Sequence, residues 1–80
     1  MTSRATFQDR MVTAQARWVA WCAAHEVDPQ AATVRHVQDA VLDHQLAGLD
    51  VDDVVDLLDA AAIATGTGRD TRLLDLRIAL

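Results

Sequence analysis

The sequence contains no lysine, no tyrosine, one proline and one cysteine among its 80 residues. A single cysteine, Cys22, cannot form a disulfide within the chain, which is expected of a protein kept in a reducing compartment. No basic and then apolar leader with a cleavage site begins the sequence, and no apolar run approaches the roughly 20 residues that span a bilayer. We therefore expect a cytoplasmic protein that is not integral to a membrane.

Aromatic residues and glycine are also scarce. Aromatic residues make up 4% of the chain and glycines number three, whereas hydrophobic residues, chiefly Ala, Val and Leu, make up 51%. This composition is typical of a compact helical chain rather than a disordered or strand-rich one. Eighty residues form one domain with too little surface to wall an enzyme cleft. We predict a single helical domain over residues 1–80, with no catalytic residues, no cofactor and no enzymatic activity.

Positive charge is in short supply as well. Seven arginines face twelve acidic residues, which gives a formal net charge of −5 and an isoelectric point of about 4.8. Nucleic-acid binders gain most of their affinity by neutralising phosphates, so this balance disfavours nucleic acid as a partner. An acidic surface suits a protein partner with a basic patch. It suits solubility equally well.

Helical spacing dominates what the sequence does contain. From about Ala5 to His25, apolar residues recur on one face of a helix. Trp18, Trp21 and Cys22 belong to this stripe, and we expect all three in the core, where a free cysteine behaves as a small hydrophobe.

Proline, threonine and glycine mark where helices begin and end. Pro29 interrupts the first helix pattern, Thr33 offers a hydroxyl to cap the next helix, and Gly48 suits a Schellman cap with Leu49 folding back. Asp70 or Thr67 opens the last segment after the glycine turn. We predict an all-α fold, a small four-helix bundle with helices near 5–25, 33–47, 51–64 and 70–80.

Five aspartates fall within the ten residues DVDDVVDLLD, Asp50 to Asp59. Asp50 stands at the N-cap, and Asp52 and Asp53 occupy the first turn, where the helix dipole favours negative charge. Asp52, Asp56 and Asp59 follow at i, i+4 and i+7, so we expect them on the outward face. Because like charges at i, i+4 destabilise a helix by about 0.2–0.5 kcal/mol per pair, basic groups of a partner would offset the row. We predict these three as partner-binding residues. The expected inward face consists of Val51, Val54, Val55, Leu58, Ala61 and Ala62.

Two patterns suggest metal ions. DDVVD, Asp52 to Asp56, matches the D-D-x-x-D pattern with which prenyl-diphosphate and terpene synthases hold magnesium, but capping of the helix explains these aspartates more simply. Cys22 and His25 are one turn apart, with His36 and His44 available to complete a zinc set, although the spacing is not that of a zinc finger. We predict no metal site.

The stretch RWVAWCAAHEVDPQAATVRHVQDAVLDHQLAGLDVDDVVDLL, about half of the chain, resembles the N-terminal core-binding, sterile-alpha-motif-like domain of tyrosine recombinases and phage integrases. The positions that carry the resemblance are Trp18, Trp21, Cys22, Pro29, Thr33, Val37, Gly48, Val54 and Leu58. The resemblance implies a DNA-binding arm domain, in which Arg35, Arg69 and Arg72 would contact phosphates. The chain departs from the family at Glu26, where a turn glycine is usual, and in its aspartate-rich third helix and its lack of tyrosine.

The C-terminal stretch RLLDLRIAL fits a helix and also alternates as a strand would. We favour a helix, because a lone edge strand would have no partner. Leu73, Leu76 and Leu80 then face the bundle, which leaves Leu74 and Ile78 on a stripe that a small monomer does not cover. Such a stripe marks an interface, so we predict a homodimer, or a heterodimer through the same residues.

The leading prediction is therefore a small acidic, non-enzymatic helical module that binds a protein partner, as an adaptor or a modulator. The alternative is the DNA-binding arm domain that the resemblance implies.

Overall fold

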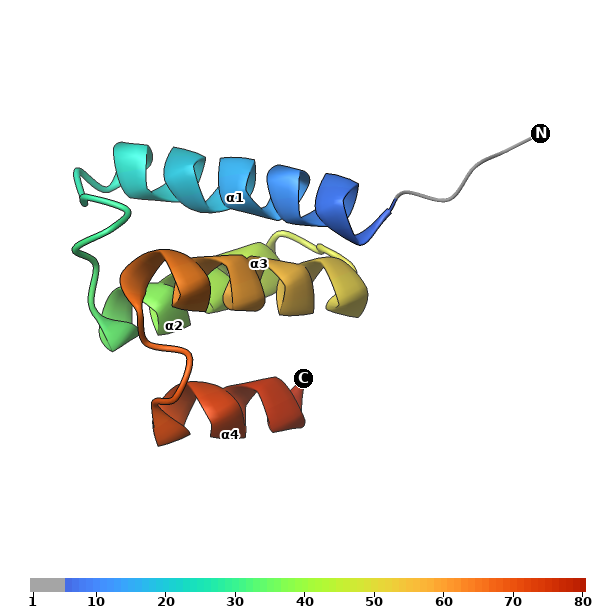
Figure 1. The fold of residues 1–80 in the computed structure, drawn as a ribbon. Coiled ribbons are helices and arrows are strands. Elements are labelled where there is room, and N and C mark those ends of the chain that lie inside the picture. The colour runs from blue at the N-terminus through green and yellow to red at the C-terminus, as the bar shows by residue number, and fades with distance from the viewer. Residues whose placement is uncertain (1–5) are drawn as a thin grey trace.

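The computed structural model describes residues 6–80. It contains four helices, α1 (Phe7–Ala24), α2 (Val34–Leu46), α3 (Val51–Thr65) and α4 (Thr71–Ala79), and no strand within these residues (Figure 1). The predicted all-α four-helix fold is confirmed, including a helix for the C-terminal stretch. Ala5, the expected start of the first helix, lies outside the described residues. Every helix of the described chain is too short or too polar to cross a bilayer.

Polar side chains at the helix starts explain where three of the helices begin. The hydroxyl of Thr6 accepts from the amide of Asp9, and that of Thr33 accepts from the amide of His36, each as part of a capping box. Asp70 caps α4 by accepting from the amide of Arg72. The predicted cap Thr33 is thus confirmed, and of the two alternatives for the last helix, Asp70 rather than Thr67 is the cap. Asp50 occupies the N-cap position of α3 but makes no side-chain capping hydrogen bond.

The first three helices end in the same left-handed turn, a Schellman motif. The turn residue is Gly48 after α2, with φ 89°, and Gly66 after α3, with φ 68°. After α1 it is Glu26, with φ 56°, although a side chain disfavours this conformation. In each turn the next amide donates to a carbonyl five residues earlier, namely Val27 to Cys22 at 2.9 Å, Leu49 to His44 at 3.1 Å and Thr67 to Ala62 at 3.0 Å. The predicted cap at Gly48 is confirmed.

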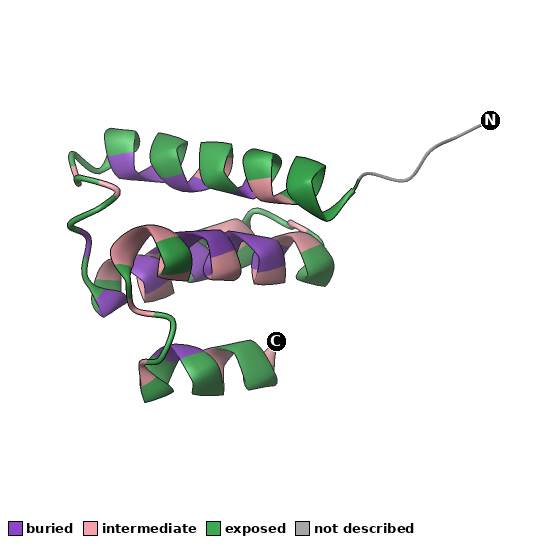
Figure 2. Ribbon diagram, in the orientation of Figure 1, coloured by how far each residue is buried: buried purple, intermediate pink, exposed green. Residues whose placement is uncertain are grey.

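Helix α3 is the central element, since it contacts α1, α2 and α4 (Figure 1). Trp18, Val37 and Val41 from the other helices pack with Leu57 and Leu58 in one core. Cys22 and Trp21 are buried with them, as predicted for both tryptophans and the cysteine. Figure 2 shows that burial follows the sides of α1, α2 and α4 that face this centre.

Contact with three neighbours buries more of α3 than a single inward face would. The prediction of its inward face was wrong at Val51, which is 57% exposed, and it omitted Leu57, which is completely buried. The outward placement of Asp56 was also wrong, since this residue is only 4% exposed. The physical reason is that α1 packs on that side of α3 and supplies the arginine that pairs with Asp56.

Candidate functional site

Asp56 is held by a residue of another helix. Arg10 of α1 donates from Nε to Oδ2 at 3.0 Å and from Nη2 to Oδ1 at 2.9 Å. The hydrogen bonds from Arg10 lower the pKa of Asp56, against the opposing effect of burial, and the charges of Arg10, Arg17 and Arg77 lower it further. Both carboxylate oxygens of Asp56 are therefore engaged within the fold.

Asp59 has a similar partner on α4. Arg77 donates from Nε to Oδ1 at 2.9 Å and from Nη2 to Oδ2 at 3.2 Å. Asp52 is exposed at the start of α3. The three aspartates therefore do not form one outward acidic row, because two of them tie α3 to α1 and α4. The sequence held a signal for this arrangement that periodicity on α3 alone missed, namely arginines on the neighbouring helices.

Leu74 lines an apolar groove where three helices meet. The groove, of about 310 Å³, is lined by Phe7, Met11, Asp59, Ala62, Ile63, Gly68, Leu74 and Arg77. The Asp59–Arg77 ion pair stands among its apolar side chains. Ile78 lies one turn beyond Leu74. Leu74 is 45% exposed and Ile78 is 85% exposed. Their predicted exposure is confirmed. Sequence reasoning did not identify Ile63 as part of this groove, and Phe7 at the start of α1 is also largely exposed.

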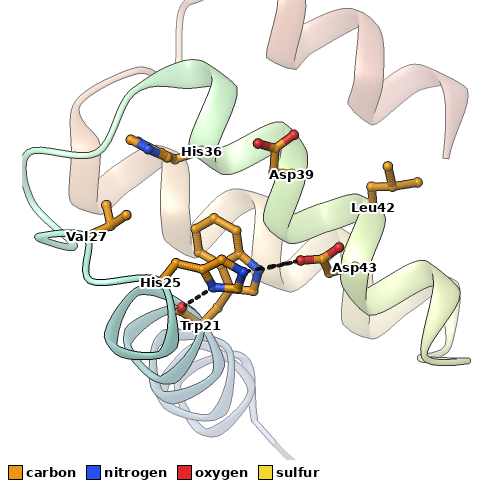
Figure 3. Close-up of a pocket in the computed structure, with 7 residues that line it drawn as sticks. All are labelled: Trp21, His25, Val27, His36, Asp39, Leu42 and Asp43. Carbon is orange, nitrogen blue, oxygen red and sulfur yellow. Dashed lines mark hydrogen bonds and ion pairs between the residues drawn. The ribbon is translucent and has the colours of Figure 1, made fainter.

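A second hollow lies between the end of α1 and the outer side of α2 (Figure 3). It has a volume of about 360 Å³ and is lined by Trp21, His25, Val27, His36, Asp39, Leu42 and Asp43. The indole of Trp21 lies between two rings, Trp18 at 5.7 Å and His25 at 4.0 Å between centroids, each nearly parallel to it. Its Nε1 donates to Oδ2 of Asp43 at 2.8 Å. These contacts fix the base of the hollow.

Hydrogen bonds determine which nitrogen of each histidine carries the proton in its neutral form. Nδ1 of His25 lies 2.8 Å from the carbonyl of Trp21, which can only accept, so this nitrogen carries the proton. Nε2 of His25 then presents a lone pair, 3.8 Å from Oδ2 of Asp43. In His36, Nδ1 accepts from the amide of Thr33 at 3.0 Å, so Nε2 carries the proton. Sequence reasoning did not identify this hollow.

The arginines of the nucleic-acid alternative are largely engaged by carboxylates. Arg35 donates from Nε to Asp39 at 3.0 Å. Arg72 makes a two-pronged contact with Asp70, at 3.0 and 2.8 Å, which raises the pKa of Arg72 and lowers that of Asp70. Arg69 is exposed in the turn before α4. Two of the three arginines, Arg35 and Arg72, are therefore already paired with carboxylates of the same chain.

The residues of the two metal-like sequence patterns do not converge on one site. Within residues 6–80, no group of three or more His, Cys, Asp or Glu side chains is arranged to hold a metal ion. In DDVVD, Asp52 is exposed whereas Asp56 turns toward Arg10. Cys22 is buried, and this burial raises the pKa of its thiol.

Comparison with known proteins found no matching family model, no matching curated protein and no matching solved structure. The resemblance to the core-binding domain of tyrosine recombinases is untested by these comparisons and stays a prediction.

Proposed function

We propose that this chain is a small non-enzymatic helical module that binds a protein partner, as an adaptor or a modulator, through the apolar groove between α1, α3 and α4. The observation that carries the proposal is the convergence of exposed apolar side chains from three helices, Phe7, Ile63 and Leu74. Contiguous exposed apolar surface on a small domain marks an interaction site. We also propose that the protein acts in the cytoplasm, since the free thiol of Cys22 suits a reducing compartment.

The chemistry of the groove suits the apolar face of an amphipathic helix. Met11 offers a flexible side chain that adapts to different shapes, and the Asp59–Arg77 pair supplies a polar element beside the apolar contacts. Helix-in-groove recognition uses apolar anchors at i and i+4. Leu74 and Ile78 have this spacing, so a second copy of the chain is the simplest partner.

An electrostatic contribution from the aspartates plays a smaller part in this proposal than the sequence suggested. Asp56 and Asp59 are engaged by Arg10 and Arg77, and only Asp52 of the three is exposed. A basic patch on the partner would therefore meet Asp52 at the start of α3 rather than a continuous row.

Sedimentation equilibrium from about 10 µM to about 1 mM tests the self-association version. We expect reversible dimers for the natural chain and weaker association for Ile63→Ser/Leu74→Ser. The matched control is Leu46→Ser on α2, which also removes a leucine, one that is 77% exposed and does not line the groove. Equal association of all three proteins would contradict a role for the groove.

A different partner is tested with a library of displayed amphipathic helices. The proposal expects at least one binder whose affinity falls with Ile63→Ser/Leu74→Ser and is retained with Leu46→Ser. A chain that stays an 8.7 kDa monomer throughout the concentration range and selects no groove-dependent helix would refute the proposal.

Binding to DNA is the weaker candidate. The guanidinium groups of Arg35 and Arg72 are engaged by Asp39 and Asp70, and each phosphate contact contributes only about −0.9 to the slope of log affinity against log salt. Micromolar binding of mixed duplex DNA at low salt that is lost in Arg69→Ala/Arg72→Ala would reverse this ranking.

A further inference from the structure

We propose that the hollow between α1 and α2 receives the cationic end of an arginine or lysine side chain from a partner protein. This inference rests on the proposed function, because it assumes a chain that binds proteins. The hollow and the apolar groove share no lining residue, so binding at each site can be tested independently of the other.

Two hydrogen-bond acceptors face each other in the hollow. The lone pair of His25 Nε2 and the carboxylate oxygen Oδ2 of Asp43 are 3.8 Å apart, with no proton on that histidine nitrogen in the neutral ring. One cationic nitrogen placed to the side of the line that joins them can lie at an ordinary hydrogen-bond distance of about 2.8–3.0 Å from both. An ammonium or a guanidinium group therefore completes a contact that the free protein leaves open.

The charge around the hollow favours the same ligand. Asp39 lies one turn before Asp43 on α2 and lines the same hollow (Figure 3). Asp39 is paired with Arg35, whose Nε is bonded to Oδ1 of Asp39 and whose side chain is otherwise exposed. Asp43 is bonded to the neutral indole of Trp21, so its charge is not neutralised by that contact. Charge-assisted hydrogen bonds to such a carboxylate are stronger than neutral ones.

The walls of the hollow suit the aliphatic stem of a basic side chain. Val27 and Leu42 provide apolar surface, while the stacked rings of Trp18, Trp21 and His25 hold the acceptors in place before a ligand arrives. Arginine and lysine bury their methylene stems against apolar surface in this way. A fixed site also loses little conformational entropy on binding.

The two indole resonances of the chain provide a direct test by NMR. Trp21 Nε1 donates to Asp43 in the hollow, whereas Trp18 Nε1 donates to the carbonyl of Pro29 at 3.1 Å and serves as an internal control. The probe is the tripeptide Gly-Arg-Gly, and its neutral counterpart carries citrulline. We expect a saturable shift of the Trp21 signal with a Kd of about 1–10 mM, a much smaller shift at Trp18 and no saturation with citrulline.

Variants identify the groups responsible. Asp43→Asn keeps an acceptor for Trp21 but removes the charge, and we expect binding about tenfold weaker, or 1.4 kcal/mol. Asp75→Asn on α4 changes the net charge equally and should bind as the natural chain does. If Asp43→Asn fails to fold, His25→Phe keeps a ring against Trp21 and removes the acceptor, with the same expected loss.

Three results would overturn the proposal: equal shifts with arginine and citrulline, no saturation below about 100 mM, or equal affinity in Asp43→Asn and Asp75→Asn. Butylguanidinium keeps the methylene stem and the guanidinium group, so it should bind about as tightly as the tripeptide, whereas the bare guanidinium ion should not saturate the Trp21 signal. Saturation by the bare guanidinium ion would overturn the assignment to a partner side chain and identify a site for free small cations. The groove variant Ile63→Ser/Leu74→Ser should bind the tripeptide normally, so a failure of the proposed function is distinguished from a failure here.

Discussion

Arg10 and Asp56 lie 46 positions apart in the sequence, yet the guanidinium of Arg10 donates two hydrogen bonds, of 3.0 and 2.9 Å, to the carboxylate of Asp56. The aspartate is almost fully buried, whereas the arginine side chain is about half exposed. The pair joins α1 to α3 on the side of α3 that sequence periodicity places in solvent. Its removal therefore weakens the contact between two helices rather than a surface charge row.

Acid should weaken this pair. The folded-state pKa of Asp56 lies below its ordinary value of 3.8 because Arg10 donates hydrogen bonds to it. The stabilisation is therefore fully present above pH 3.8 and is lost as the pH falls through the lower, folded-state pKa. We expect Asp56→Asn to reduce the free energy of unfolding by about 1–3 kcal/mol at neutral pH.

The deficit in the free energy of unfolding of Asp56→Asn should shrink as the pH falls below 3.8, because the unfolded natural chain then takes up a proton on Asp56 that the folded chain still excludes. Urea denaturation of both proteins between neutral and acid pH measures the difference. Asp75→Asn, which alters an exposed aspartate of α4, is the control and should change stability little. A deficit in Asp56→Asn that stays constant down to the most acidic condition would contradict this account.

The left-handed turn at Glu26 predicts a stabilising substitution. A residue with a side chain is strained at φ 56°, and glycine is not. We expect Glu26→Gly to raise the free energy of unfolding by about 0.5–1 kcal/mol. Gly48→Ala should lower it by a similar amount, since φ is 89° there and no atom crowds the added carbon. Thermal and urea unfolding measure both changes. If Glu26→Gly lowers the free energy of unfolding instead, the Glu26 side chain makes contacts that stabilise the fold more than the relief of backbone strain does.

Removing the side-chain cap of α2 should lower the free energy of unfolding by a similar amount. The hydroxyl of Thr33 accepts from the amide of His36, which satisfies one of the free donors of the first turn. We expect Thr33→Ala to reduce the free energy of unfolding by about 1 kcal/mol. Thr71→Ala at the first position of α4, which is capped by Asp70 instead, is the matched control. Equal losses in the two variants would argue against the capping bond.

Because α3 is central in the fold, removing one of its buried side chains should lower the free energy of unfolding by a larger amount. Leu57 is completely buried, and replacing it with alanine removes apolar contacts and leaves a cavity. We expect Leu57→Ala to reduce the free energy of unfolding by about 2–5 kcal/mol. Leu46→Ala on α2 removes a largely exposed leucine and should change it by less than about 0.5 kcal/mol. Calorimetry compares the two, and similar values would place Leu57 outside the core.

Local patterns in the sequence were enough to predict the helices, most of their ends and the exposure of the last apolar stripe. Thr33, Gly48 and Asp70 act through hydrogen bonds to residues a few positions away, so their roles depend on local chain geometry alone. Leu74 and Ile78 fall beside the buried Leu73 on a short final helix, and helical spacing is enough to separate the two faces.

Which side chains meet across helices depends on how the whole chain packs. Periodicity assigns one inward face to α3, but burial depends on how many neighbours a helix has, and α3 has three. That is why Asp56 is buried against Arg10, why Asp59 is paired with Arg77, and why His25 and Asp43 present two acceptors to the same hollow. Each of these pairs brings together residues from different parts of the chain, and their distances follow from packing that no local pattern encodes.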